Sequence, residues 1–261
     1  MDFNTVQALH LKELNGITKW WKDLDFTTNL PYAKDRLVEC YLWIMGAYFK
    51  PKYSLARTFL TKVTAMTSIL DDTYDKYGTY EELELLTKCI ERWDVGVIDQ
   101  LSEYMKLFYQ ALLNVYSEME AKVAKEGRLY AVDYAKESMK RIVKAYLAEA
   151  KWCQESYVPL MEEYMQVALI SSTYPMLITN SLVGMGEVAT KEVFDWISNT
   201  PQMLKASTII GRLTDDIVTH EFEQIQDHVA SDFIYEHGDS YSNPHIIKAK
   251  IELLLVDPVI L

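Results

Sequence analysis

Apolar residues recur along most of this chain at intervals of three and four positions, with polar residues between them. That spacing puts the apolar side chains on one face of an α-helix and predicts an amphipathic helix wherever it persists. The pattern is interrupted by proline or glycine at Pro31, Pro51, Gly78, Gly127 and Pro201. Helices are therefore expected near residues 4–23, 34–48, 53–71, 80–93, 98–125, 130–155, 160–183, 190–197 and 201–226.

The sequence has no convincing alternating strand pattern and no internal repeat. The predicted fold class is all-α with roughly eight to ten helices, too many for a simple four-helix bundle. Within the helix expected at 160–183, Ser171, Ser172 and Thr173 precede Pro175. Proline removes a helical hydrogen bond, and short hydroxyl side chains can satisfy the freed carbonyls. The segment is either a kinked core helix or a break whose carbonyls face a cavity.

Composition narrows the class of protein. Of 261 residues, 49% are hydrophobic and only 9 are Gly and 7 Pro, which favours a compact helical protein. A net charge of −12 argues against nucleic acid as a partner. Three cysteines without CxxC spacing indicate reduced thiols and a cytoplasmic location. The sequence shows no membrane-spanning apolar run and no secretory signal in residues 1–25, so we expect a soluble protein without a membrane partner.

Two acidic clusters are the candidate chemistry, one at Asp71–Asp75 and one at Asp215–Glu223. Residues four apart share a face of an α-helix, so Asp71 and Asp75 should point together, and Asp215, Thr219 and Glu223 should form a second row. Rows of carboxylate and hydroxyl oxygens suit Mg²⁺. Metal ions would also let an acidic protein hold an anionic substrate, most often a phosphate ester.

With these clusters in place, the chain resembles the catalytic α-domain of plant class I terpene synthases. It is most similar to the sesquiterpene synthases, among them the cadinene-forming kind. Both metal motifs occur in the family's order and separation, and further short segments of the sequence also match the family. The matching segments are Ile69–Asp75, Asp215–Glu223, Arg36–Tyr41, Glu91–Asp94 and Glu149–Trp152.

The resemblance implies a class I isoprenoid synthase bundle around a central cavity, which binds a prenyl diphosphate with three Mg²⁺ ions, or with Mn²⁺ in their place. Asp71 and Asp75 would then hold two of the ions, and Asp215, Thr219 and Glu223 the third. Asp72, about 100° round the helix from Asp71, would support them from behind.

The same resemblance assigns further residues to the substrate. Arg212, about one turn before Asp215, matches the family's diphosphate-sensing arginine. Arg36 matches the second arginine of an RxR element that captures the leaving group, and Lys34 stands in its first position. Lysine keeps the charge there but loses the bidentate fork of arginine.

Other matches concern the cavity. Trp43 is expected at its floor or wall, where an aromatic face stabilises a cation by about 1–2 kcal/mol. Ser171, Ser172 and Thr173 match the family's helix break, whose carbonyls face the cation. Asp239 and Tyr241 match a lid element with a part in proton transfer, and Tyr235 is a third candidate for that region.

The chain also departs from the family. It lacks the N-terminal helical domain of plant relatives and, near residues 231–233, two helices that usually lie there. Residues 1–261 are thus expected to form one catalytic domain that acts as a monomer. Three alternatives stay open: a monoterpene synthase using geranyl diphosphate, a chain-elongating prenyltransferase, and a non-catalytic helical binding or scaffold domain with solvated acidic faces.

Overall fold

The computed structural model describes residues 3–224 and, within its last helix, not the side chains of residues 217 and 219–224. Across that range the chain is helical and contains no β-strand, as the apolar spacing predicts. The longer helices are α1 (Phe3–Leu24), α3 (Leu37–Ala47), α4 (Ser54–Asp72), α5 (Tyr80–Arg92), α6 (Glu103–Val123), α7 (Leu129–Glu155), α8 (Met161–Ser171), α9 (Tyr174–Val183), α10 (Lys191–Ser198) and α11 (Gln202–Gln224). Shorter elements are α2 (Phe26–Asn29), η1 (Pro51–Tyr53), η2 (Thr73–Tyr77), η3 (Val95–Gln100), η4 (Ala124–Glu126) and η5 (Gly186–Val188).

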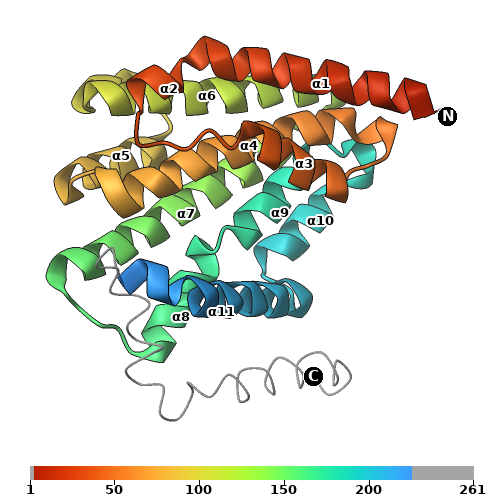
Figure 1. The fold of residues 1–261 in the computed structure, drawn as a ribbon. Helices are drawn as coiled ribbons and strands as arrows, with labels where there is room; N and C mark the ends of the chain where they lie inside the picture. Colours follow the sequence, from red (N-terminus) through yellow and green to blue (C-terminus); the bar gives the residue numbers. More distant parts are fainter. Residues whose placement is uncertain (1–2, 225–261) are drawn as a thin grey trace.

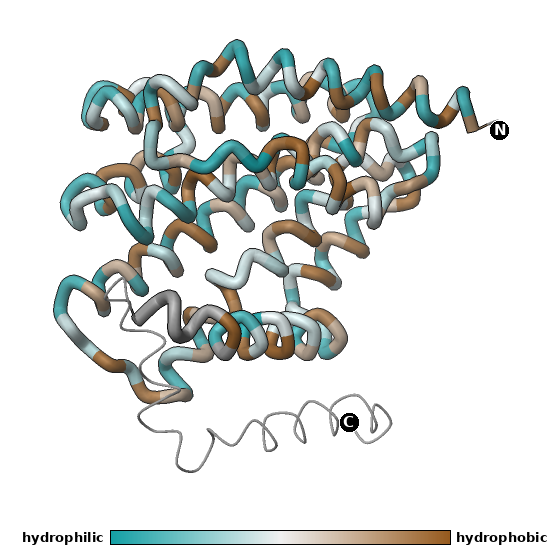
Figure 2. Tube along the Cα trace, viewed as in Figure 1, coloured by the Kyte–Doolittle hydropathy of each residue, from teal (hydrophilic) through white to brown (hydrophobic). Residues whose placement is uncertain are grey.

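The helices stack in layers. In the view of Figure 1, α1 and α6 run along the top, α4, α5 and α7 lie in the middle, and α8 and α11 lie along the bottom. Apolar and polar residues alternate along α1 and its neighbours in Figure 2, as expected for helices that bury one face. Of the helices within residues 3–224, none combines the length and apolar character needed to cross a membrane.

Helix α4 is the central element, and it differs from its neighbours in being buried on nearly every side. It packs against α3, α6 and α9, and its core residues include Phe59, Val63, Met66 and Ile69. A helix buried all round is fixed by packing rather than by its own propensity. The end of α4, where the first acidic cluster begins, is therefore held in a set position.

The helix expected at 160–183 is two helices. Helix α8 ends at Ser171 and α9 begins at Tyr174, with Pro175 in the first turn, where proline is tolerated because no amide hydrogen is needed there. Thr173 lies between them in the left-handed region, at a φ of 69°. The interruption is therefore a true break, and the prediction of a structural change at these hydroxyl residues is confirmed.

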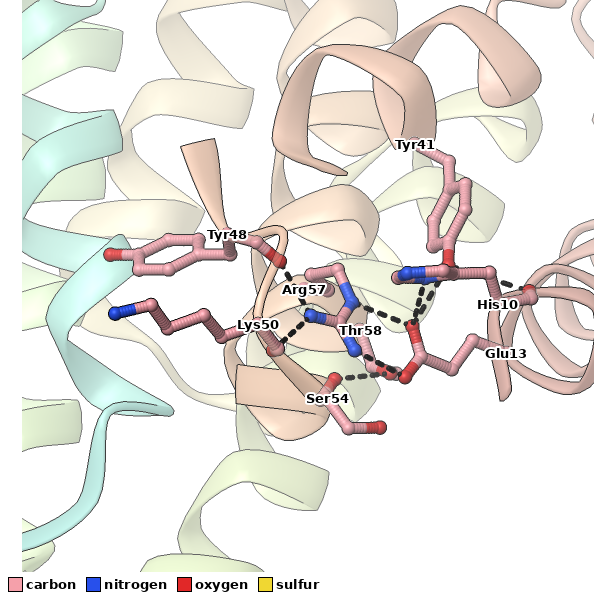
Figure 3. A network of polar contacts seen from close by, with 8 residues as sticks. All are labelled: His10, Glu13, Tyr41, Tyr48, Lys50, Ser54, Arg57 and Thr58. Atoms are coloured by element: carbon pink, nitrogen blue, oxygen red, sulfur yellow. Dashed lines mark hydrogen bonds and ion pairs between the residues drawn. The ribbon is translucent and has the colours of Figure 1, made fainter. Parts of the chain in front are cut away.

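A buried ion pair fastens α1 to the middle layer (Figure 3). Arg57 on α4 donates from Nε and Nη2 to the two carboxylate oxygens of Glu13 on α1, at 2.8 and 2.7 Å. Its Nη1 donates to the backbone carbonyls of Tyr48 and Lys50, and Tyr41 Oη donates to Glu13 Oε2 at 2.8 Å. The network joins α1, α3 and the loop before η1 to α4.

Gly184, directly after α9, allows that helix to approach α4 at backbone distance. A Cβ there would lie 2.4 Å from the Cα of Ala56, which only a backbone shift can relieve. We expect Gly184→Ala to lower the free energy of unfolding by about 1–3 kcal/mol, the usual cost of overpacking, in urea titrations. Gly16→Ala is the matched control, since Gly16 is exposed within α1 with no atom in the way, and it should stabilise by about 0.5–1 kcal/mol. Equal effects of the two changes would contradict the close approach.

The Glu13 and Arg57 pair makes stability depend on pH. Burial alone would raise the pKa of Glu13, but hydrogen bonds from Arg57, Ser54 and Tyr41 outweigh it and lower the pKa below 4.5. A lowered pKa in the folded state stabilises above the unfolded value and loses that contribution as the pH falls through the folded value. Glu13→Gln should therefore cost about 3 kcal/mol near neutral pH, and the difference from wild type should shrink below about pH 4.5. Glu103→Gln, at an exposed pair with Lys106, should cost no more than about 1 kcal/mol in the same measurements.

Candidate functional site

The first acidic cluster lies at the end of α4 and in the π-helical turn η2. Asp71 is partly buried, whereas Asp75 is exposed. Burial, and next the charge of Asp75, raise the pKa of Asp71 to about 7. The hydroxyl of Tyr146 is close enough to lower that pKa somewhat, although it makes no hydrogen bond of standard geometry within the described residues. Two carboxylates thus repel each other at a desolvated site.

The first cluster departs from the expected α-helical spacing. Residues Thr73–Tyr77 form a π-helix, which has more residues per turn than the α-helix expected through Asp75. The two carboxylates still interact, because η2 continues directly from α4. Such local π-helical turns recur at functional sites.

Asp72 turns away from Asp71 and holds the segment before α3. It is buried, accepts a hydrogen bond from the backbone N–H of Lys34 at 3.3 Å, and lies 3.8 Å from Lys76 Nζ. Lys34, which is exposed, is thereby brought beside the first cluster. Arg36, half-buried at the start of α3, follows two residues later. The supporting role expected for Asp72 toward the metal ions stays a prediction.

The second cluster lies on α11, which remains helical through Asp215, Thr219 and Glu223. Asp215 is exposed, and its Oδ2 lies 3.9 Å from Nη2 of Arg212. Asp216 is buried, and it accepts hydrogen bonds from Arg212 and from Tyr164 on α8. The side chains of Thr219 and Glu223 lie outside the described residues.

Glu149, on α7, connects the two clusters. Burial raises its pKa to about 7; the Ser171 hydrogen bond and the charge of Arg212 lower it, and the charges of Asp71 and Asp216 raise it again. The carboxyl group of Glu149 therefore interacts electrostatically with charged residues on both α4 and α11. The structure thus brings Asp71 and the Arg212–Asp216 region near one residue, although 144 positions separate Asp71 from Asp215 in the sequence.

The helix break adjoins the same region. Ser171 Oγ donates to Glu149 Oε1 at 2.6 Å, and Ser172 Oγ donates to the carbonyl of Leu169 at 3.0 Å. The carbonyl of Thr173 accepts from the amide of Leu177 at 2.9 Å. These hydroxyl groups therefore hold local structure, and Ser171 also orients an acid that faces both clusters. That the break's carbonyls face a substrate cation stays a prediction.

The remaining expected residues are less well placed. Trp43 lies on α3 with 57% of its surface exposed, so the residues around it do not enclose it. Tyr235, Asp239, Tyr241 and the segment near 231–233 lie outside the described residues. A groove of about 370 Å³ lies elsewhere, between α1 and α6, and includes Trp20 and Glu118 but none of the expected site residues.

The site suits Mg²⁺ by the chemistry of its donors. Among the side chains that the structure describes, no three His, Cys, Asp or Glu groups form a ligand cage. Mg²⁺ needs no such cage, since it is usually held by one or two carboxylates, water and substrate phosphates. The raised pKa of Asp71 marks a place where a cation would relieve repulsion.

Sequence reasoning missed Glu149, Tyr146 and Tyr164 as parts of this site. Glu149 and Tyr146 are three residues apart on α7, so helical spacing places them on the same side. An acid and a tyrosine on the face that α7 turns to the core were the available signal. Tyr164 carried none, because a tyrosine in a helix usually only packs.

The fold is an all-α domain in which two acidic clusters lie near one buried carboxyl group, and comparison with known proteins gives its family. The family described as "Terpene synthase family, metal binding domain" matches residues 22–236. Because that match covers most of this chain, the chain belongs to the terpene synthase family.

Named relatives agree with this membership. The chain is 59% identical over 243 residues to (-)-germacrene D synthase from Vitis vinifera, covering 92% of this chain and 44% of that protein. It is 54% identical over 243 residues to Sesquiterpene synthase 2 from Toona sinensis, again covering 92% and 44%. The chain thus spans less than half the length of these relatives.

A solved structure confirms the fold. Isoprene synthase from grey poplar, in complex with three Mg²⁺ ions and dimethylallyl-S-thiolodiphosphate, superimposes with a TM-score of 0.83 at 28% identity. The match covers 97% of this chain and 50% of that one. The expected class I terpenoid synthase bundle is therefore the fold of this protein.

Because the ionised carboxyl of Asp71 is repelled at its site, replacing it should stabilise the metal-free protein and reduce stabilisation by Mg²⁺ with diphosphate. A carboxyl whose pKa is raised by folding destabilises the fold when ionised, so Asp71→Asn should raise the thermal midpoint of the metal-free protein above about pH 7. A gain of about 1 kcal/mol corresponds to roughly 2–4 °C. Mg²⁺ with inorganic diphosphate should further stabilise wild type by mass action and Asp71→Asn far less. Asp23→Asn, at an exposed position on α1, should behave as wild type in both scans; a full ligand-induced rise in Asp71→Asn would contradict a metal at this residue.

Proposed function

We propose that residues 1–261 form the catalytic domain of a sesquiterpene synthase. In this proposal the enzyme ionises farnesyl diphosphate, releases diphosphate and directs the resulting carbocation to cyclise. The observation that carries the proposal is the position of Glu149, whose carboxyl group lies near enough to Asp71, Arg212 and Asp216 for all three charges to act on it. Two acidic motifs that meet near one residue can hold metal ions around a single diphosphate.

The chain's own residues would bind the metals and the leaving group. Asp71 and Asp75 would hold two ions, and the row Asp215, Thr219 and Glu223 a third, the number present in the isoprene synthase complex. Mg²⁺, or Mn²⁺ in its place, supplies a Lewis acid that offsets the charge developing on the departing diphosphate.

Basic side chains complete the diphosphate site in this proposal. Arg212 lies beside Asp215, and Lys34 is held beside the first cluster through Asp72. Arg36 follows Lys34 at the start of α3. Guanidinium groups bind phosphate oxygens through paired N–H donors, so the two arginines would orient the leaving group while Lys34 adds charge.

The hydrocarbon part of the substrate would meet Trp43 and the helix break at Ser171, Ser172 and Thr173. Asp239, Tyr241 and Tyr235 would act from the C-terminal segment in closing the site and moving a proton. Farnesyl diphosphate is the expected substrate because a sesquiterpene has its carbon count and Sesquiterpene synthase 2 is 54% identical to this chain.

The deciding experiment is incubation with geranyl, farnesyl and geranylgeranyl diphosphates in the presence of Mg²⁺, with products identified by gas chromatography. We expect cyclic hydrocarbons from farnesyl diphosphate, and a loss of turnover on the order of 10²–10³-fold in Asp71→Ala and Asp215→Ala, since transition-state stabilisation of the leaving group is weakened. Asp23→Asn should retain wild-type turnover.

Two outcomes would count against the proposal. Products from geranyl diphosphate alone would make the chain a monoterpene synthase. Undiminished hydrocarbon production by Asp71→Ala would remove the metal-ligand role and leave the acidic clusters as solvated helix faces.

A further inference from the structure

A buried contact between α8 and α11 lies directly behind Arg212. Tyr164 Oη on α8 donates to Asp216 Oδ2 at 2.7 Å. Asp216 Oδ1 accepts from Nε of Arg212 at 2.5 Å and also from Nη2. Tyr164 is 1% exposed and Asp216 2%, so water has little access to this part of the chain.

The two oxygens of Asp216 have separate tasks. One receives the guanidinium of Arg212, and the other receives the Tyr164 hydroxyl. A buried carboxylate oxygen without a hydrogen-bond donor lowers stability. Without the Tyr164 hydroxyl, the carboxylate of Asp216 could rotate and offer the guanidinium a different oxygen. Burial raises the pKa of Tyr164 far above its ordinary value, so the hydroxyl stays protonated and acts as the donor.

The two neighbouring aspartates of the second cluster, Asp215 and Asp216, therefore lie in different surroundings. Asp215 is exposed and lies 3.9 Å from Arg212, whereas Asp216 is buried and accepts hydrogen bonds from Arg212. With Nε and Nη2 directed at Asp216, the orientation of the planar guanidinium is set, and so is the direction of its remaining N–H groups. An arginine fixed before its ligand arrives loses less side-chain entropy on binding.

Helix α8 also holds a second group near this guanidinium. Its last residue, Ser171, donates to Glu149, whose pKa burial raises to about 7 although the Ser171 hydrogen bond and the charge of Arg212 act in the opposite direction. One helix thus positions both an acid and, through Asp216, the arginine that faces it. Tyr164 and Ser171 are seven residues apart, two helical turns, so both extend from the same side of α8.

We propose that Tyr164 is a positioning residue that, through Asp216, orients the guanidinium of Arg212 to receive the diphosphate. This inference rests on the proposed function, because it takes Arg212 to contact diphosphate. Tyr164 itself touches neither substrate nor metal, and its effect passes through Arg212 alone.

The test compares two tyrosines. Tyr164→Phe removes the hydroxyl and keeps the packed ring. Tyr116→Phe does the same at a fully buried tyrosine whose hydroxyl donates to Asn180 Oδ1 at 3.0 Å, away from the acidic clusters. Both variants should show a lower thermal midpoint, because each loses one buried hydrogen bond.

Only Tyr164→Phe should weaken binding of inorganic diphosphate with Mg²⁺, measured by isothermal titration calorimetry. We expect about a tenfold rise in Kd, equivalent to about 1.4 kcal/mol, and a fall in kcat for farnesyl diphosphate. Tyr116→Phe should keep the wild-type Kd and kcat. A Kd for Tyr164→Phe equal to that of Tyr116→Phe would overturn the inference and leave the proposed function intact.

A second measurement tests the route through Arg212. In the Arg212→Gln background, adding Tyr164→Phe should change Kd by less than about twofold, since coupled residues are not additive. A full tenfold effect in that background would show that Tyr164 acts by another path. Wild-type protein that neither binds diphosphate with Mg²⁺ nor turns over a prenyl diphosphate would refute the proposed function and this inference together.

Discussion

The rest of this structure depends on one constraint: several carboxyl groups lie close together where burial removes them from water. Helices α4, α7 and α11 each bring carboxyl groups to one region, and the pKa values of Asp71 and Glu149 are both raised to about 7, first of all by burial. Like charges at low dielectric repel strongly, and a site built this way is stable only if the rest of the fold opposes the repulsion. The same repulsion gives the site its affinity for cations.

The opposing stability comes from packing that leaves the helices little freedom. Helix α4 is buried on nearly every side and ends in the first cluster, while the Arg57 and Glu13 pair fastens α1 to it. Gly184 lets α9 lie against α4 at backbone distance. Both contacts lie in the first turn of α4, and the burial of Met66, Ile69 and Leu70 holds the other end, which carries Asp71. Helix α8 holds α11 through the hydrogen bond from Tyr164 to Asp216, and it holds Glu149 on α7 through Ser171.

Much of the fold could be read from the sequence because amphipathic helices carry their period in local spacing. Each of the nine expected stretches contains a helix within residues 3–224, and the one at 160–183 divides into two helices at Ser172–Thr173, where hydroxyl residues and Pro175 interrupt the pattern. The π-helical turn at Thr73–Tyr77 was not foreseen, since it has no local signature in an apolar period. Trp43 is 57% exposed among the described residues, and its expected place at a cavity wall stays a prediction, because enclosure depends on elements distant in sequence.

The sequence by itself determined the all-α class, the two acidic clusters and the oxygen-rich faces suited to Mg²⁺, all of which follow from spacing within one helix. Only the tertiary structure decided that both clusters lie near Glu149, that Asp72 accepts a hydrogen bond from the backbone of Lys34, and that Asp216 is buried against Arg212 while Asp215 is exposed. The physical reason is that neighbouring residues on a helix point about 100° apart. Which of them becomes buried depends on the helix packed against it, and that neighbour comes from a distant part of the chain.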